Sequence, residues 1–137
     1  MVKIFIVLQL IQFENRIEVV SNKDEHFVVY KANVDYEYID AMLKLAQKRV
    51  KPVFAAVGDH AEIHKIELCK QLIVTALTKG EEHFKVLFLP MAGVYKADSK
   101  NIYLLDILNQ SFKLQKAIWV GIDSFGNIVA AYPNSNF

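Results

Sequence analysis

The stretch Lys51–Gly80, KPVFAAVGDHAEIHKIELCKQLIVTALTKG, decides the fold that we expect for this chain. Val53–Val57 is a short apolar run directly after a proline, which is typical of a strand that is buried on both faces. Gly58 and Asp59 interrupt the run, and we predict that Asp59 begins a long helix that ends at Gly80. The stretch therefore predicts a buried strand, a tight turn and a long helix.

The flanking sequence adds strands and two further helices. On the N-terminal side, the hydrophobic pattern predicts strands over residues 4–13, 16–21 and 26–31 and a helix over residues 35–49. On the C-terminal side, it predicts a strand over residues 84–89, a helix from residue 98 or 99 to residue 112, and a hairpin over residues 117–132. Strands that alternate with helices predict an α/β fold, with a single mixed sheet, parallel central strands and helices on both faces. We expect one domain over residues 1–137 and detect no internal repeat.

Composition narrows the classes of protein to which the chain can belong. Its 137 residues include 16 basic and 15 acidic side chains, which give a formal net charge of +1. A nearly neutral chain has no electrostatic footprint for nucleic acid or for an anionic membrane, so we expect neither as a partner. The single cysteine, Cys69, excludes an intramolecular disulfide and is typical of a reducing compartment, which predicts a cytoplasmic protein.

Two segments resemble the thioredoxin superfamily. Ala41–Val57, AMLKLAQKRVKPVFAAV, is similar to the helix, Lys-Pro pair and apolar strand that precede the redox motif of that family, and Ile118–Tyr132, IWVGIDSFGNIVAAY, is similar to its closing hairpin. The resemblance implies a thioredoxin-like fold with an extra N-terminal β-hairpin. The family's Cys-x-x-Cys would fall near Ala61–Lys65 and its cis-proline near Ala117, and both motifs are missing. Because thiol–disulfide exchange needs an attacking and a resolving thiol, the resemblance implies a redox-inactive member.

An RNase H-like fold is the rival interpretation, because that fold also begins with three antiparallel strands followed by a helix and a strand. Its nuclease activity needs a cluster of carboxylates for two metal ions. No acidic residue lies between Lys3 and Phe13, so we expect no nuclease under this fold either.

The densest group of titratable residues lies at the start of the predicted long helix. His60 and His64 are four residues apart, a helical spacing that can hold zinc. A capping box of Asp59 and Glu62, with both histidines in solvent, explains the same residues without a metal. Cys69 falls on the apolar face of this helix, where an inert buried thiol and a reactive thiol are the two interpretations.

The function that we expect is a non-enzymatic one: a redox-inactive protein-interaction or self-associating module without a cofactor. Its partner would be another protein or a second copy of the chain, with a homodimer as the simplest assembly, because strands at both chain ends can leave a sheet edge free for pairing. The alternative is a small enzyme, or a metal- or ligand-binding protein, that uses Asp59, His60 and His64 at the helix N-terminus. A ligand bound above Gly58 is a third interpretation.

Overall fold

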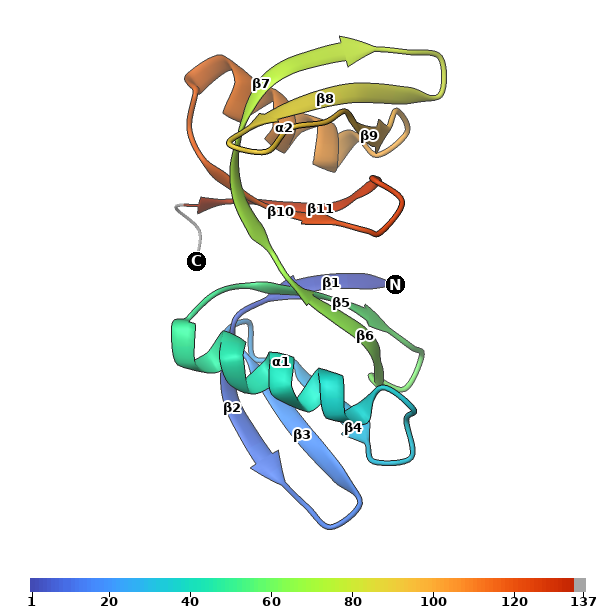
Figure 1. The fold of residues 1–137 in the computed structure, drawn as a ribbon. Helices are drawn as coiled ribbons and strands as arrows, with labels where there is room; N and C mark the ends of the chain where they lie inside the picture. The colour runs from blue at the N-terminus through green and yellow to red at the C-terminus, as the bar shows by residue number, and fades with distance from the viewer. Residues whose placement is uncertain (135–137) are drawn as a thin grey trace. The chain divides into compact units, whose positions relative to one another are not determined.

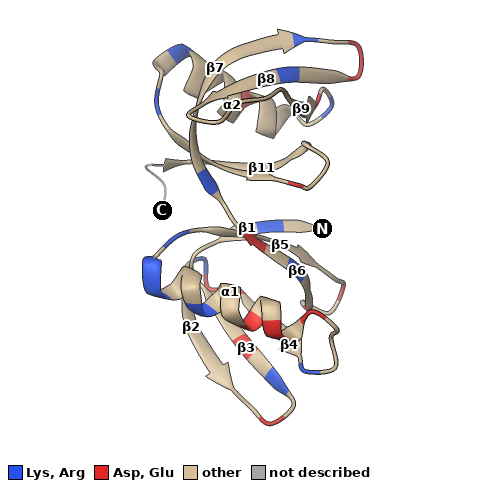
Figure 2. Cartoon of the chain, in the orientation of Figure 1, with Lys and Arg blue, Asp and Glu red and all other residues tan. Residues whose placement is uncertain are grey.

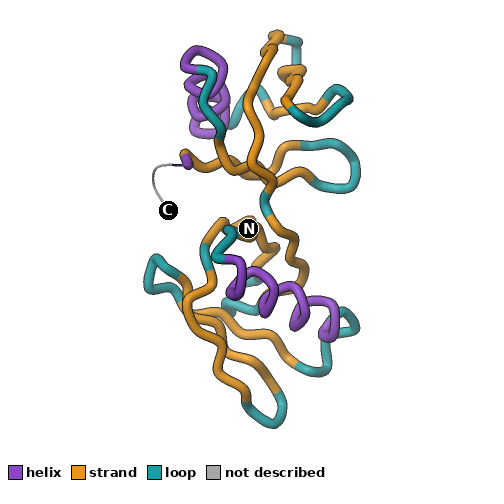
Figure 3. Tube along the Cα trace, turned by 60° about the vertical axis from the view of Figure 1, so that its left-hand side comes forward, coloured by secondary structure: helices purple, strands orange, loops and turns teal. Residues whose placement is uncertain are grey.

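The structure, a computed structural model, describes residues 1–134 and is built mainly from β-strands. Strands hold 49% of the described residues and helices 21%. The described residues form two α-helices, α1 (Tyr36–Arg49) and α2 (Ile102–Leu114) (Figure 3). The chain divides into two compact units, unit 1 over Met1–Cys69 and unit 2 beginning at Lys70. The predicted α/β fold, with one mixed sheet and helices on both faces, is therefore wrong.

Unit 1 contains six strands and α1 (Figure 1). The strands are β1 (Val2–Phe5), β2 (Val7–Gln12), β3 (Arg16–Ser21), β4 (His26–Tyr30), β5 (Val53–Val57) and β6 (Ile63–Leu68). They form two three-stranded sheets with the orders β1-β5-β6 and β2-β3-β4. Only Ile6 separates β1 from β2, so one bent segment contributes to both sheets.

A parallel bridge between Val28 and Glu62 brings the far edges of the two sheets of unit 1 together, and the Val28 N–H donates to Ala61 O at 3.0 Å. The strands therefore form a partly open barrel. The helix α1 contributes Ile39, Leu43 and Ala46 to the core of unit 1, where they are buried with apolar side chains from both sheets. One core thus fills unit 1.

Unit 2 has five strands in one sheet, with α2 packed against it. The strands are β7 (Lys70–Lys79), β8 (His83–Leu89), β9 (Tyr95–Asp98), β10 (Ile118–Ile122) and β11 (Ile128–Pro133), in the order β11-β10-β7-β8-β9. The long strand β7 pairs with β10 through its first residues and with β8 through the rest. A parallel bridge between Lys96 and Asn127 again joins the far ends of the sheet.

Unit 2 repeats the architecture of unit 1. Each unit runs through three antiparallel strands, a helix and two further strands, if β1 and β2 are counted as one bent strand. The first hairpin of each unit, β2–β3 in unit 1 and β7–β8 in unit 2, has the same register, since Val7 pairs with Ser21 and Val74 pairs with Phe88. In both hairpins the next residue of the first strand, Leu8 or Thr75, is left unpaired at a bulge. The internal repeat that the sequence did not reveal is therefore present in the structure.

Residues after the helices correspond as closely. Each helix ends at a residue with a positive φ angle, which is 53° at Val50 and 51° at Gln115. The turn of each closing hairpin also contains a residue with a positive φ angle, which is 62° at Ala61 and 80° at Gly126. These matched backbone conformations allow a residue in one unit to serve as the control for its counterpart in the other.

The predicted helix from Asp59 to Gly80 is wrong, because these residues form the strands β6 and β7. Leu72 and Val74 are buried with an exposed or half-buried residue on either side, which is the period of a strand. The sequence Ile73-Val74-Thr75 also consists of β-branched residues, which favour strands over helices. Strand pairing is antiparallel in all three sheets. The architecture therefore conflicts with a thioredoxin-like α/β fold.

Val50 gives a first testable prediction. It ends α1 in the left-handed conformation, which is strained for a β-branched residue, and its side chain is exposed and adds little packing. Val50→Gly is expected to stabilise unit 1 by about 1 kcal/mol, measured from the hydrogen exchange of the α1 amides. Gln115→Gly in unit 2 is the control and should gain less, because the Gln115 side chain donates to Val74 O and Phe112 O. A loss of α1 protection in Val50→Gly would contradict the prediction.

Candidate functional site

The predicted site residues Asp59 and His60 lie in the turn between β5 and β6 rather than in a helix. The Gly58 N–H donates to Glu62 O at 2.9 Å, and the Ala61 N–H donates to Gly58 O at 3.1 Å. His64 follows on β6. The spacing of His60 and His64 that could hold zinc requires both residues on one helical face, and the structure forms a turn and a strand here instead.

Glu62 is the centre of this turn. Its Oε2 accepts a hydrogen bond from the His60 N–H at 2.9 Å, and its Oε1 lies 3.3 Å from His64 Nε2. The hydrogen bond from its own N–H lowers the pKa of Glu62, burial opposes this, and the His60 N–H and the two imidazoles add to the lowering. The structure therefore brings together Glu62, His64 and the His60 backbone, and the predicted Asp59–Glu62 capping box is not formed.

This arrangement does not build a metal centre. Within residues 1–134, no group of three or more His, Cys, Asp or Glu side chains is placed to hold a metal ion. The Asp59 side chain takes no part in the hydrogen bonds that hold the turn. What the turn can offer is one exposed imidazole beside a carboxylate, which is an ordinary surface contact.

Cys69 is buried at the end of unit 1, directly after β6. Its N–H donates to Pro52 O at 2.9 Å. Burial raises the pKa of the Cys69 thiol to about 12. Since the thiolate is the nucleophile and the metal ligand, a thiol that stays protonated at neutral pH is a poor candidate for either role.

The corresponding turn of unit 2 is organised by Asp123. Its Oδ1 accepts hydrogen bonds from the N–H groups of Phe125 and Asn127 at 2.9 and 2.8 Å. Burial opposes the ionisation of Asp123, but the hydrogen bonds from Asn127 and Phe125 outweigh it and hold its pKa below the ordinary value. The turn leaves the Phe125 side chain 85% exposed. Sequence reasoning did not single out Phe125, and the signal that could have found it is an aromatic residue inside a predicted polar turn.

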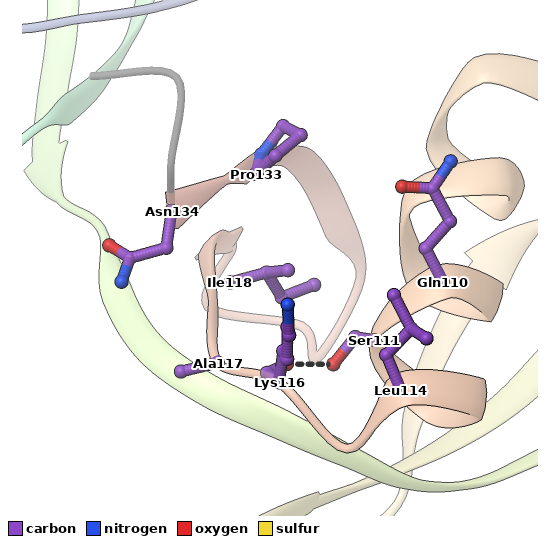
Figure 4. Close-up of a pocket in the computed structure, with 8 residues that line it drawn as sticks. All are labelled: Gln110, Ser111, Leu114, Lys116, Ala117, Ile118, Pro133 and Asn134. Atoms are coloured by element: carbon purple, nitrogen blue, oxygen red, sulfur yellow. Dashed lines mark hydrogen bonds between the residues drawn. The ribbon is translucent and has the colours of Figure 1, made fainter.

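A pocket of about 400 Å³ lies in unit 2 between α2 and the strands β10 and β11 (Figure 4). Its lining residues are Gln110, Ser111, Leu114, Lys116, Ala117, Ile118, Pro133 and Asn134. At its wall the Ser111 hydroxyl donates to Lys116 O at 2.7 Å and accepts from the Val74 N–H at 3.1 Å. None of the predicted site residues lines this pocket.

The edge of the sheet β2-β3-β4 exposes several large apolar side chains of unit 1. Strand β2 pairs with β3 on one side. On its other side, among the described residues, a single side-chain hydrogen bond reaches it, from Gln47 Nε2 to Leu8 O at 3.0 Å. Leu8 is 58% exposed, Ile11 37% and the following Phe13 40%. The sequence of β2, VLQLIQ, contains neither a charged residue nor proline.

No family model, curated protein or solved structure matches this chain. No match therefore supports the resemblance to the thioredoxin superfamily. Among the helices that the structure describes, none has the length and apolar character needed to cross a bilayer. Function has to be argued from the chain's own geometry.

Proposed function

We propose that this protein is a self-associating interaction module, in which β2 of one chain pairs with β2 of a second copy. The observation that carries the proposal is the free edge of β2, with its exposed side chains Leu8 and Ile11 and the neighbouring Phe13. The proposed role involves no redox chemistry, in keeping with the buried thiol of Cys69. The single cysteine also supports a cytoplasmic location.

An unprotected sheet edge favours pairing with another strand. Exposed edges present rows of unpaired N–H and C=O groups, and proteins usually blunt them with charged residues, proline or bulges. The bulge at Leu8 protects only the start of β2, and the regular residues Gln9–Gln12 remain at the edge. An identical antiparallel edge satisfies these groups on both chains around a two-fold axis. A second copy is therefore the occupant with the best-matched hydrogen-bonding groups.

The apolar character of this edge is not required by the fold. In unit 2 the positions that correspond to Leu8, Ile11 and Phe13 are Thr75, Thr78 and Gly80. The hairpin of unit 2 keeps the same register and the same bulge with these small or polar residues. The Arg16 guanidinium lies 4.2 Å from the centre of the Phe13 ring, so Phe13 has a packing partner within unit 1. The register and bulge that the two hairpins share do not explain why unit 1 exposes Leu8 and Ile11.

Sedimentation velocity of the full chain over a range of concentrations tests the proposal. The wild-type protein should form dimers, and the double substitution Leu8→Thr with Ile11→Thr, which copies the residues of unit 2, should shift it to monomers. Val34→Thr is the matched control, since Val34 is 95% exposed but lies outside the strands. This control should leave the dimer intact, and circular dichroism checks that all variants fold.

Hydrogen exchange supplies an independent readout of the surface used. The amides of β2 should gain protection as the protein concentration rises, while those of the corresponding part of β7 should not. A wild-type chain that stays monomeric at its highest soluble concentration would overturn the proposal. A dimer that survives Leu8→Thr with Ile11→Thr would overturn the assignment to β2.

A further inference from the structure

The outer face of unit 2 carries two lysines directly opposite each other. Val86 and Ala97 are buried, so by the alternation of a strand their neighbours Lys85 and Lys96 point outward, and both are exposed. The two residues are register partners on β8 and β9. Neither takes part in the ion pairs found among residues 1–134. Like charges at opposite positions destabilise a sheet, and an anion bound between them would relieve the repulsion.

An exposed aromatic ring lies in the turn that is hydrogen-bonded to Lys96. The turn that contains Phe125 is fastened to β9, because the Lys96 N–H donates to Gly126 O at 3.0 Å and Asn127 forms a bridge with Lys96. Asp123 fixes the same turn from within. An apolar ring that is exposed to water is not stabilised by burial. Because hydrogen bonds hold the backbone of this turn in place, the ring can stack on a flat ligand with little loss of conformational entropy.

Neither feature is needed to build the barrel, because unit 1 lacks both. The positions that correspond to Lys85 and Lys96 are Glu18 and Val28, and Glu18 is paired with Arg16 at 3.9 Å. The position that corresponds to Phe125 is His60.

Net charge also differs between the units, as the distribution of basic and acidic residues in Figure 2 illustrates. Unit 1 has nine basic and ten acidic residues, whereas unit 2 has seven lysines and five acidic residues. The net charge of +1 for the whole chain, from which we expected no nucleic-acid partner, does not reveal this difference between the units. One carboxylate of unit 2, Asp98, lies on the outer face opposite His83, and its Oδ1 accepts the Lys100 N–H.

We infer that unit 2 binds single-stranded nucleic acid, with a phosphate between Lys85 and Lys96 and a base stacked on Phe125. A ligand that combines flexible phosphates with exposed flat rings matches both features. In partly open five-stranded barrels of the OB type, oligonucleotides bind on the face of the second and third strands and on the loop between the last two. Here these elements are β8, β9 and the turn 123–127. Because fold alone does not establish function, the inference rests on the three side chains.

Fluorescence anisotropy with a labelled oligothymidine, titrated with the 137-residue chain at several salt concentrations, tests the inference. Lys85→Gln with Lys96→Gln should weaken binding at least tenfold and should reduce the slope of log K against log salt by about 0.7 for each phosphate that the protein no longer neutralises. Phe125→Ala should weaken binding about tenfold without changing the salt slope, because stacking releases no counterions. The two substitutions therefore have separate signatures.

Lys113→Gln is the control, since it removes one charge from the last turn of α2, which is not one of the elements of the proposed site. It should leave the affinity nearly unchanged. An equal loss with Lys113→Gln would show attraction by net charge alone and overturn the inference. Absence of binding at low salt, or equal competition by inorganic polyphosphate with no effect of Phe125→Ala, would also overturn it. Self-association through β2 is measured separately, so either proposal can fail without the other.

Discussion

Replacing Leu108 with alanine is expected to lower the free energy of unfolding of unit 2 by about 2–5 kcal/mol. Leu108 is fully buried on α2 and belongs to the core cluster that fills this unit. Truncation removes apolar packing and leaves a cavity among β-strands that cannot easily collapse. Small domains have little stability in reserve, so the loss is a large fraction of the total. Trp119, on β10 of unit 2, allows urea unfolding to be followed by fluorescence.

Leu43→Ala provides the matched control for this prediction. Leu43 occupies the corresponding position on α1 and is also fully buried, but it belongs to the other core cluster. The two clusters share no residue. Hydrogen exchange should therefore show reduced protection in unit 2 for Leu108→Ala and in unit 1 for Leu43→Ala. Equal loss in both units for either variant would contradict the separation of the two cores.

Local patterns in the sequence predicted part of this fold correctly. The apolar spacing of residues 35–49 indicated α1, and the alternating runs around Asp123–Asn127 indicated the hairpin of β10 and β11. Both elements are specified by periodicity or turn chemistry within a short segment. These two segments also carried the resemblance to the thioredoxin superfamily. Correct local elements did not determine the global topology, because helix–strand and strand–turn–strand units occur in many folds.

The stretch Lys51–Gly80 shows why the rest was missed. A turn begins at Gly58, and Asp59 with Glu62 imitates the start of a helix. Ile63 and Ile66 then stand three residues apart, a spacing that also suits a helix, although in β6 this spacing results from a register shift next to Val57. A strand bulge can therefore imitate helical periodicity over a few residues. The candidate metal spacing of His60 and His64 also depended on this helix, since it required both residues on one helical face.

The repeat escaped detection because the two units share conformation more than residue identity. The helices keep a leucine at Leu43 and Leu108, whereas Ala46 corresponds to Ser111 and Val50 to Gln115. Register, bulges and left-handed residues match because they depend on backbone geometry, which many sequences satisfy. The residues that differ between the two surfaces carry both proposals made above, so the divergence of the repeat is itself informative about function.

Ser111→Ala is expected to lower the free energy of unfolding of unit 2 by about 1–3 kcal/mol. Ser111 is one of the two polar residues with fully buried side chains in the described chain. Its hydroxyl accepts a hydrogen bond from the buried Val74 N–H next to the bulge of β7. It donates a hydrogen bond to Lys116 O after α2 (Figure 4). Alanine leaves the Val74 N–H without an acceptor, and a buried donor that loses its partner carries the full desolvation penalty.

Two further substitutions separate this hydrogen bond from simple loss of volume. Ser111→Cys keeps the size of the side chain but accepts a hydrogen bond weakly, so it should lose nearly as much stability as alanine. Ser99→Ala is the control, because the Ser99 hydroxyl donates to Glu82 O at an exposed position, where water replaces the bond. Its effect should stay below about 0.5 kcal/mol. If Ser111→Ala lowered the free energy of unfolding no more than Ser99→Ala, the Ser111 hydroxyl would not contribute to the attachment of α2 to β7. Apolar packing alone would then hold the helix on the sheet of unit 2.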